Sequence, residues 1–266
     1  MKSIEQLGNI SNRTALVTGG AGYLGYAICE TLAESGVRVI IVDNNISAGK
    51  DCLKKLNSKF GNHHLLISCD LANKESINKA VDFAHLHFES LDILINCASL
   101  VGTSDIKGWT TKFDLQEYTT FEKALSINLT SVFYLIQQCQ DLLEKSNNPS
   151  IINIGSIYGF SGQKLSMYED SNYLTPAAYS ASKGGVIQLT KYLASILSPQ
   201  IRVNCISPGG IENNHDKEFI NKYKSFTPLN RMAQREDLKG AIHFFSSDLS
   251  SYITGQNLIV DGGWSL

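Results

Sequence analysis

Tyr179 and Lys183 are the residues whose types and spacing point most directly to chemistry. They stand four positions apart in a helical segment, so both side chains project from one face. A free phenol has a pKa near 10 and gives up its proton poorly at neutral pH, whereas a neighbouring ammonium favours the phenolate. We therefore expect Lys183 to lower the pKa of Tyr179. The phenol would then protonate a carbonyl oxygen in reduction or deprotonate an alcohol in oxidation. Ser156, which ends a strand, would hydrogen-bond the reacting oxygen.

A glycine-rich turn, Thr18–Gly25, follows the first expected strand and opens the first expected helix. Glycines there permit a tight turn and a close approach of the backbone to a pyrophosphate, and the helix N-terminus attracts the anion. Asp43 ends the next strand at a spacing typical of a dinucleotide-binding fold. Its carboxylate would accept hydrogen bonds from the ribose hydroxyls and repel a 2′-phosphate. The following Asn44 and Asn45 supply no cation that would bind such a phosphate. We expect NAD rather than NADP.

Short apolar runs alternate with longer amphipathic stretches almost from end to end. The expected strands are Thr14–Thr18, Arg38–Val42, His64–Ser68, Ile93–Asn96, Ser150–Ile154, Arg202–Ile206 and Asn257–Val260. The expected helices are Leu24–Ser35, Ile46–Phe60, Lys74–Phe88, Phe121–Lys145, Ala178–Leu197 and Arg235–Ser247. This alternation predicts a Rossmann-like α/β fold, a doubly wound parallel sheet of about seven strands with helices on both faces.

No linker or repeat divides the chain, so we expect one domain over residues 1–266. Three long polar segments, 100–117, 161–177 and 209–226, each follow an expected strand. Ligands in open α/β sheets bind beyond the carboxyl ends of the strands, and long loops are often functional. We interpret these three segments as substrate loops.

The order of these motifs resembles the short-chain dehydrogenase/reductase family over nearly the whole chain. The resemblance is carried by Thr18–Gly25, Asp43, Asp70, Asn96-Cys97-Ala98-Ser99, Asn128, Ser156, Tyr179-x-x-x-Lys183 and Pro208-Gly209. It implies a nicotinamide cofactor, a homotetramer or homodimer, and a catalytic set of Asn128, Ser156, Tyr179 and Lys183. The implied cofactor-binding residues are Gly19, Gly22, Tyr23, Leu24, Gly25, Asp43, Asn44, Asp70, Leu71, Asn96, Ala98, Ser99, Tyr179, Lys183, Pro208, Gly209 and Ile211.

The same resemblance implies individual roles. Asp70 and Leu71 would meet the adenine, and Asn96–Ser99 would line the middle of the cofactor. Lys183 would hold the ribose hydroxyls, and Asn128 would hold a water that relays protons to Lys183. A bond from the Asn128 side chain to nearby backbone is the structural alternative.

Three positions depart from the family pattern. Tyr23 stands where the single-domain branch usually has the second glycine of T-G-x-x-x-G-x-G, Ser99 stands where glycine is common, and Asn213 stands where threonine often follows Pro-Gly. The glycines at 19, 22 and 25 look instead like those of the longer branch that modifies nucleotide sugars. A nucleotide-sugar epimerase or dehydratase is therefore an alternative, although the chain lacks the large C-terminal substrate domain expected of one.

The segment 161–173 is rich in donors, acceptors and aromatic side chains, which suits a polyhydroxylated ligand better than a steroid or an acyl chain. The loops 100–109 and 208–214 resemble those of bacterial dehydrogenases in surface-sugar and flagellin-glycan modification. We expect an NAD-dependent oxidoreductase acting on a secondary alcohol or ketone of a sugar derivative. A 3-oxoacyl thioester reductase is a further alternative, and a catalytically dead dinucleotide sensor is disfavoured because the four catalytic positions keep competent residues.

Composition narrows the remaining classes. A net charge of −2 in 266 residues favours neither nucleic acid nor acidic lipid as a partner. No apolar run or N-terminal signal indicates a membrane protein or export, so a cytoplasmic enzyme is expected. The 6 cysteines are scattered and expected to be reduced, and the 6 histidines lack H-E-x-x-H, so no metal is expected. There is no G-x-S-x-G motif of a hydrolase, and Trp264 is expected in a subunit contact.

Overall fold

A computed structural model describes residues 1–61, 63–101, 106–168 and 174–266. Within them lies one sheet of seven parallel strands, as expected, and the strands follow the order β3-β2-β1-β4-β5-β6-β7. The strands are β1 (Thr14–Thr18), β2 (Arg38–Asp43), β3 (Leu65–Ser68), β4 (Ile93–Asn96), β5 (Ser150–Ile154), β6 (Arg202–Pro208) and β7 (Asn257–Val260). The central strands β4, β5 and β6 are buried along their whole length, which explains why β4 and β5 are mostly apolar.

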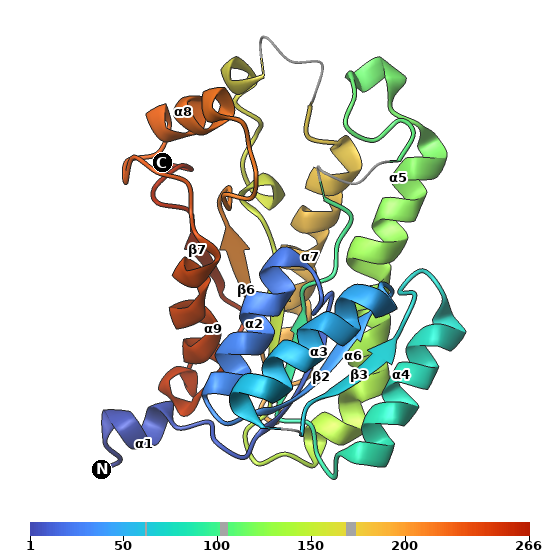
Figure 1. Ribbon diagram of the computed structural model, residues 1–266, viewed down its shortest axis with the longest axis vertical. Helices are drawn as coiled ribbons and strands as arrows, with labels where there is room; N and C mark the ends of the chain where they lie inside the picture. Colours follow the sequence, from blue (N-terminus) through green and yellow to red (C-terminus); the bar gives the residue numbers. More distant parts are fainter. Residues whose placement is uncertain (62, 102–105, 169–173) are drawn as a thin grey trace.

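Helices cover both faces of this sheet (Figure 1). The structure gives α1 (Ile4–Gly8), α2 (Tyr23–Glu34), α3 (Ile46–Phe60), α4 (Lys74–His87), α5 (Tyr118–Leu125), α6 (Ser131–Glu144), α7 (Ala177–Ile196), α8 (Lys217–Ser225) and α9 (Lys239–Ser246). One apolar cluster joins the sheet to α2, α3 and α9, and a second joins it to α4, α6 and α7. The chain therefore forms the expected Rossmann-like, three-layered fold.

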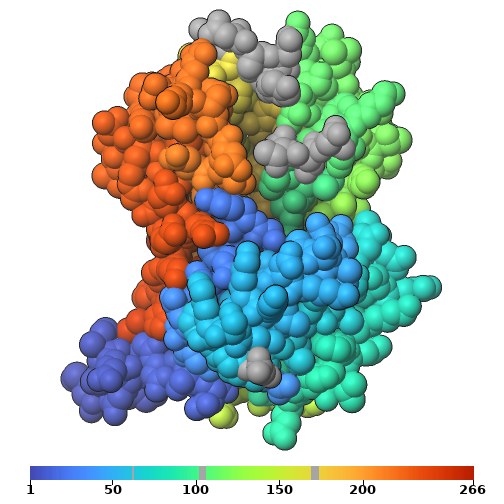
Figure 2. Space-filling model, in the orientation of Figure 1, coloured from blue at the N-terminus to red at the C-terminus, as the bar shows by residue number. Residues whose placement is uncertain are grey.

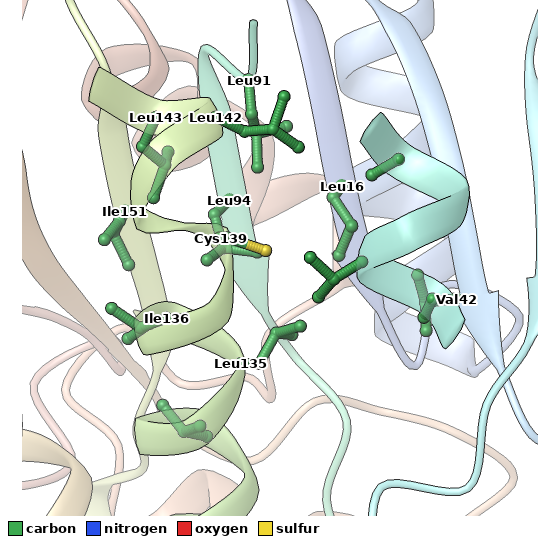
Figure 3. Close-up of a cluster of buried hydrophobic side chains, with 14 of the residues drawn as sticks. Leu16, Val42, Leu91, Leu94, Leu135, Ile136, Cys139, Leu142, Leu143 and Ile151 are labelled. Atoms are coloured by element: carbon green, nitrogen blue, oxygen red, sulfur yellow. The ribbon is translucent and has the colours of Figure 1, made fainter. Parts of the chain in front are cut away.

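The second cluster shows how a helix is fixed on the sheet (Figure 3). Leu135, Ile136 and Cys139 project from one side of α6 toward Leu94 and Ile151 of the neighbouring strands β4 and β5. Each of these five side chains is at most 2% exposed. Removal of this much apolar surface from water is the main favourable term for placing α6. Because α6 continues from α5, this packing also fixes the segment that carries Asn128.

Two expectations about the elements need correction. The single helix expected over Phe121–Lys145 is interrupted by a π-helical turn, Ser126–Thr130, between α5 and α6. The segment 209–226, expected to be a loop, contains α8. Asp216 begins α8 because its side chain accepts a hydrogen bond from the backbone N–H of Phe219 at 2.7 Å.

Among the described residues, no helix combines the length and the apolar character needed to cross a bilayer.

A buried histidine makes the stability of this fold pH-dependent. His64 is 3% exposed, its Nδ1 accepts a hydrogen bond from the Val39 N–H at 3.3 Å, and burial lowers its pKa to about 4. Unfolded histidine titrates near 6.5, so between these values only the unfolded chain takes up the proton. We expect the free energy of unfolding to fall by up to about 3 kcal/mol as the pH drops through this window.

Denaturant unfolding of the protein and of His64→Gln at pH 7.5 and pH 4.5 measures this contribution. The variant should lose less stability on acidification than the unchanged protein. His85→Gln removes an exposed imidazole from α4 and serves as the control. Equal acid sensitivity of the protein and of His64→Gln would contradict the assignment.

Candidate active site

The backbone of the glycine-rich turn is folded so tightly that Gly19 and Gly25 have no room for a side chain. Gly19 has φ +65°, and a Cβ on Gly25 would lie 1.9 Å from the Gly19 carbonyl oxygen. Gly22 is the N-cap of α2 and provides no side-chain cap. The first turn of α2 therefore offers its backbone N–H groups and the positive end of its dipole to an anion. These features fit the diphosphate of a dinucleotide.

Asp43 is fixed at the carboxyl end of β2. Its two carboxylate oxygens accept hydrogen bonds from the N–H groups of Ala21 and Asn45, each at 2.9 Å. The carboxylate thereby links the glycine-rich turn to the start of α3. Each oxygen retains a further lone pair for a sugar hydroxyl.

A cavity of about 540 Å³ opens at the carboxyl edge of the sheet. It lies where the strand order reverses between β1 and β4, the usual ligand position in open α/β sheets. Of the residues proposed from sequence for the cofactor, those that line it are Gly19, Gly22, Tyr23, Leu24, Gly25, Asp43, Asn44, Asp70, Leu71, Ala98, Ser99, Tyr179, Lys183, Pro208, Gly209 and Ile211.

Asn96 is the proposed cofactor residue that the structure places elsewhere. It is buried, and its Nδ2 donates to Oδ1 of Asn153 at 2.8 Å, so it does not line the cavity. Cys97, within the segment Asn96–Ser99 expected beside the cofactor, lines the cavity. The cavity also includes residues that the sequence motifs did not indicate for the cofactor: Val42, Cys69, Leu100, Val101, Ile127, Ile154, Gly155, Asn213 and His215. Most of them flank a motif residue, which is the signal that could have found them.

Ser156, Tyr179 and Lys183 meet beyond the end of β5. Lys183 is buried, and its Nζ donates a hydrogen bond to the Ile154 carbonyl oxygen at 2.7 Å. The same nitrogen lies 5.8 Å from the centre of the Tyr179 ring. Ser156 is 6% exposed and lines the cavity beside them. The three groups needed for proton transfer to and from a carbonyl oxygen therefore share one wall.

The expected electrostatics of this wall are wrong in one respect. Burial raises the pKa of Tyr179 above its ordinary value, and a hydrogen bond from Ser156 opposes that rise. Burial also lowers the pKa of Lys183. The pKa of Tyr179 is not brought below that of a free phenol here, because desolvation is the largest influence on it. Tyr179 is consequently protonated at neutral pH and is ready to act as an acid.

Asn128 lies in the π-helical turn and holds the loop after β4. Its Oδ1 accepts from the Leu100 N–H at 2.7 Å, and its Nδ2 donates to the Leu100 carbonyl at 3.2 Å and to Ser182 Oγ at 3.1 Å. Ser182 in turn donates to the Tyr179 carbonyl oxygen. Asn128 does not line the cavity. It links α5 and α6 both to a cavity loop and to α7, and its water-holding role stays a prediction.

A second cavity, of about 680 Å³, shares Ser156 and Tyr179 with the first. One wall comes from α8 and from His215 just before it. The His215 ring stacks on that of Phe219 at 5.0 Å, and Tyr223 follows one turn later. The other wall includes Tyr158 and Tyr168, whose hydroxyl oxygens lie 2.9 Å apart. Figure 2 shows a recess above the blue N-terminal surface, between the orange segment that includes α8 and the green segment that includes α5.

Two sequence interpretations change here. Trp264 is fully buried within the chain, where it stacks on Tyr223 at 6.1 Å and meets Tyr158 edge-on, so the expectation of a subunit contact is wrong.

Of the segment 161–177, residues 169–173 lie outside the described part of the chain, as do 102–105 of the segment 100–117. The sequence reading missed α8 as a wall of this cavity, although the apolar spacing of Phe219 and Tyr223 could have revealed it.

Known proteins are similar to this chain over nearly its whole length. A family model described as enoyl-(acyl carrier protein) reductase matches residues 20–265. The chain is 29% identical to post-translational flagellin modification protein A of Campylobacter coli, covering 97% of this chain and 100% of that protein. It is 32% identical to 3-oxoacyl-[acyl-carrier-protein] reductase FabG of Aquifex aeolicus, covering 96% and 98%. It is also 32% identical to a protein named "Probable galactose dehydrogenase GalD" of Rhizobium meliloti, covering 97% of each.

Solved structures are equally similar. The Pseudomonas aeruginosa RhlG/NADP active-site complex superposes with a TM-score of 0.87 at 28% identity, covering 98% of this chain and 99% of that one. A short-chain dehydrogenase of Leptospira borgpetersenii with bound NAD+ gives 0.84 at 33% identity, covering 100% and 97%. The chain belongs to the short-chain dehydrogenase/reductase family and is an oxidoreductase of that family.

The hydrogen bond from Ser156 to Tyr179 sets a pH dependence. Alcohol oxidation needs the phenolate, so its rate should rise with pH towards the raised pKa of Tyr179. In Ser156→Ala the opposing hydrogen bond is lost, so the pKa rises further and the alkaline limb of the rate profile should move to higher pH. We also expect kcat to fall by about 10²- to 10³-fold, as for loss of one donor to a reacting oxygen.

Steady-state oxidation rates across pH 6 to 10.5 check this expectation. Ser156→Thr keeps a hydroxyl, so the alkaline limb of its pH–rate profile should lie at the same pH as that of the unchanged protein. An unshifted limb in Ser156→Ala would show that the serine does not influence the ionisation of Tyr179.

Proposed function

We propose that this protein is an NAD-dependent oxidoreductase that interconverts a secondary alcohol and a ketone on a sugar or sugar derivative. The observation that carries the proposal is the junction of the two cavities. One cavity has the turn and carboxylate suited to a dinucleotide, the other suits a polar ring, and Ser156 and Tyr179 belong to both.

The dinucleotide, when bound, supplies or accepts the hydride. In reduction, Tyr179 donates its proton to the substrate carbonyl oxygen, and Ser156 donates a hydrogen bond that stabilises charge there. In oxidation, Tyr179 removes the hydroxyl proton. Lys183 holds the ribose hydroxyls in this proposal, and its positive charge favours the phenolate whenever Tyr179 ionises.

The walls of the second cavity favour a sugar. Flat aromatic faces of Phe219 and His215 suit the C–H groups of a pyranose ring, and the hydroxyls of Tyr158 and Tyr168 suit its hydroxyl groups. His215, Asp216 and Lys222 add polar groups to the rim. A relative named as a galactose dehydrogenase and another named for flagellin modification are consistent with such a substrate.

A 3-oxoacyl thioester reductase is the second candidate. The family model and several relatives carry names of acyl carrier protein reductases, which supports it as well as the names above support a sugar. Met167, Met232 and Leu174 give the same cavity apolar surface that an acyl chain could contact. The two candidates require the same hydride and proton transfers and differ only in what the second cavity holds.

A comparison of turnover rates on the two classes of substrate distinguishes these candidates. We expect NADH consumption with keto-sugars at rates well above those with 3-oxoacyl thioesters or simple ketones, measured by absorbance at saturating NADH. Tyr179→Phe should lower kcat by about 10²- to 10⁴-fold while NADH still binds, because only the acid is removed. Turnover confined to acyl thioesters would end the sugar proposal. Turnover unaffected by Tyr179→Phe would show that the acid is misplaced.

A change in the second cavity gives an independent test. Tyr168→Phe removes one hydroxyl from the wall and should raise KM for a keto-sugar about three- to tenfold, the value of one hydrogen bond, with little change in kcat. The KM for an acyl thioester should barely change. Tyr192→Phe, on the exposed side of α7, is the matched control.

Cofactor preference depends on the charge of Asp43. We expect kcat/KM to be higher for NADH than for NADPH, because the carboxylate repels a 2′-phosphate. Asp43→Asn keeps the shape and an acceptor oxygen but removes the charge, so the preference should shrink by roughly tenfold. Asp51→Asn removes the same charge from the exposed face of α3 and should leave the ratio unchanged. A wild-type preference for NADPH would overturn the assignment of NAD.

A further inference from the structure

Tyr23 occupies a turn position at which its family pattern calls for glycine, and it reaches across the cofactor cavity. It is the first residue of α2, it lines the cavity, and it is 39% exposed. Its hydroxyl donates a hydrogen bond to the Glu212 carbonyl oxygen at 2.9 Å. Glu212 lies between Ile211 and Asn213, which both line the same cavity. The phenol therefore connects two parts of the cavity wall that are 189 positions apart in the chain.

A second set of contacts holds the far side of this connection. The Glu212 N–H donates to the Ala233 carbonyl at 2.8 Å, and the Ala233 N–H donates to the Gly210 carbonyl at 2.9 Å. Gln234 Nε2 donates to the Glu212 carboxylate at 3.2 Å. Residues 210–212 are thus paired with residues 233–234, which lead directly into the turn containing Arg235.

Arg235 connects this second set of contacts back to Tyr23. Its guanidinium lies 5.3 Å from the centre of the Tyr23 ring and 5.8 Å from that of Tyr26, one turn along α2. A guanidinium at that distance over an aromatic face is attracted to it, which restricts the ring. The Tyr23 side chain is therefore held both by its hydroxyl and by its face. A glycine at this position would provide neither contact.

We propose that Tyr23 is a strap that fastens the loop after β6 to the first helix and thereby slows the entry and release of the dinucleotide. The segment from Gly209 to His215 borders the cofactor cavity and the substrate cavity together. A ligand that leaves between this segment and the start of α2 must part them, and the hydrogen bond from Tyr23 opposes that movement. Tyr23 acts here as a positioning residue, away from the reacting atoms. The inference requires a dinucleotide in the first cavity, as in the proposed function, but does not depend on the identity of the substrate.

The experiment compares the protein with Tyr23→Phe, which removes the hydroxyl and keeps the ring under Arg235. Stopped-flow fluorescence measures the rate of NADH release after mixing with excess NAD+. Tyr23→Phe should release NADH about two- to tenfold faster, the effect of one hydrogen bond between neutral groups. Hydrogen–deuterium exchange without any dinucleotide should also be faster in the peptide that covers residues 209–216.

Tyr26→Phe is the matched control, because it removes a phenol hydroxyl from the same helix and beneath the same guanidinium. That hydroxyl contacts Glu30 of α2 rather than the loop, so release and exchange should both equal those of the unchanged protein. A circular dichroism melt of each variant checks that the fold is kept. Equal release rates and equal exchange in Tyr23→Phe and the unchanged protein would refute the strap. Failure of NADH to bind even the unchanged protein would instead refute the proposed function and the release role together, while the exchange measurement still reports whether Tyr23 fastens the loop.

Discussion

The buried ammonium of Lys183 is the constraint on which the catalytic geometry depends. A charge removed from water is costly unless it is hydrogen-bonded, and here the Ile154 carbonyl at the end of β5 accepts from it at 2.7 Å. To reach this oxygen, α7 must pack very close to the segment that follows β5. Gly159 and Gly184 permit that approach, because a Cβ on Gly159 would lie 2.8 Å from the Lys183 backbone and one on Gly184 would lie 3.1 Å from the Gly159 carbonyl oxygen. Tyr179, one turn earlier on α7, is positioned by the same packing.

This close packing also explains why two ligand environments can meet at one pair of hydroxyl groups. Ser156 follows β5 and Tyr179 belongs to α7, so their separation is set by the sheet and its covering helix rather than by mobile loops. On one side lies a turn adapted to a diphosphate, and on the other lies a wall of aromatic rings from α8 and from the segment after β5. The second wall is supported from behind by Trp264, which stacks on Tyr223, so changes of substrate preference can arise there without disturbing the proton-transfer groups.

Much of the fold could be predicted because its signals are local. Strands buried on both faces are mostly apolar, as Ile93–Asn96 and Ser150–Ile154 are, and the glycines at 19 and 25 reflect a turn with no room for a side chain. What could not be predicted depends on contacts between distant segments. The π-helical turn at Asn128 is tied to Leu100, Trp264 is buried by Tyr158 and Tyr223, and the pKa of Tyr179 reflects desolvation by its surroundings. None of these neighbours can be identified from spacing along the chain.

The cysteines have a practical consequence. All six are free thiols, and burial raises the pKa of each, to about 12 for Cys97 and Cys139 and to about 11 for Cys205. Because the thiolate is the reactive form, these sulfur atoms are poor nucleophiles at neutral pH. Cys97 is the most telling case, since it borders the cofactor cavity and would block it if alkylated or joined to glutathione. We therefore expect the six thiols to react slowly at neutral pH with reagents that require a thiolate.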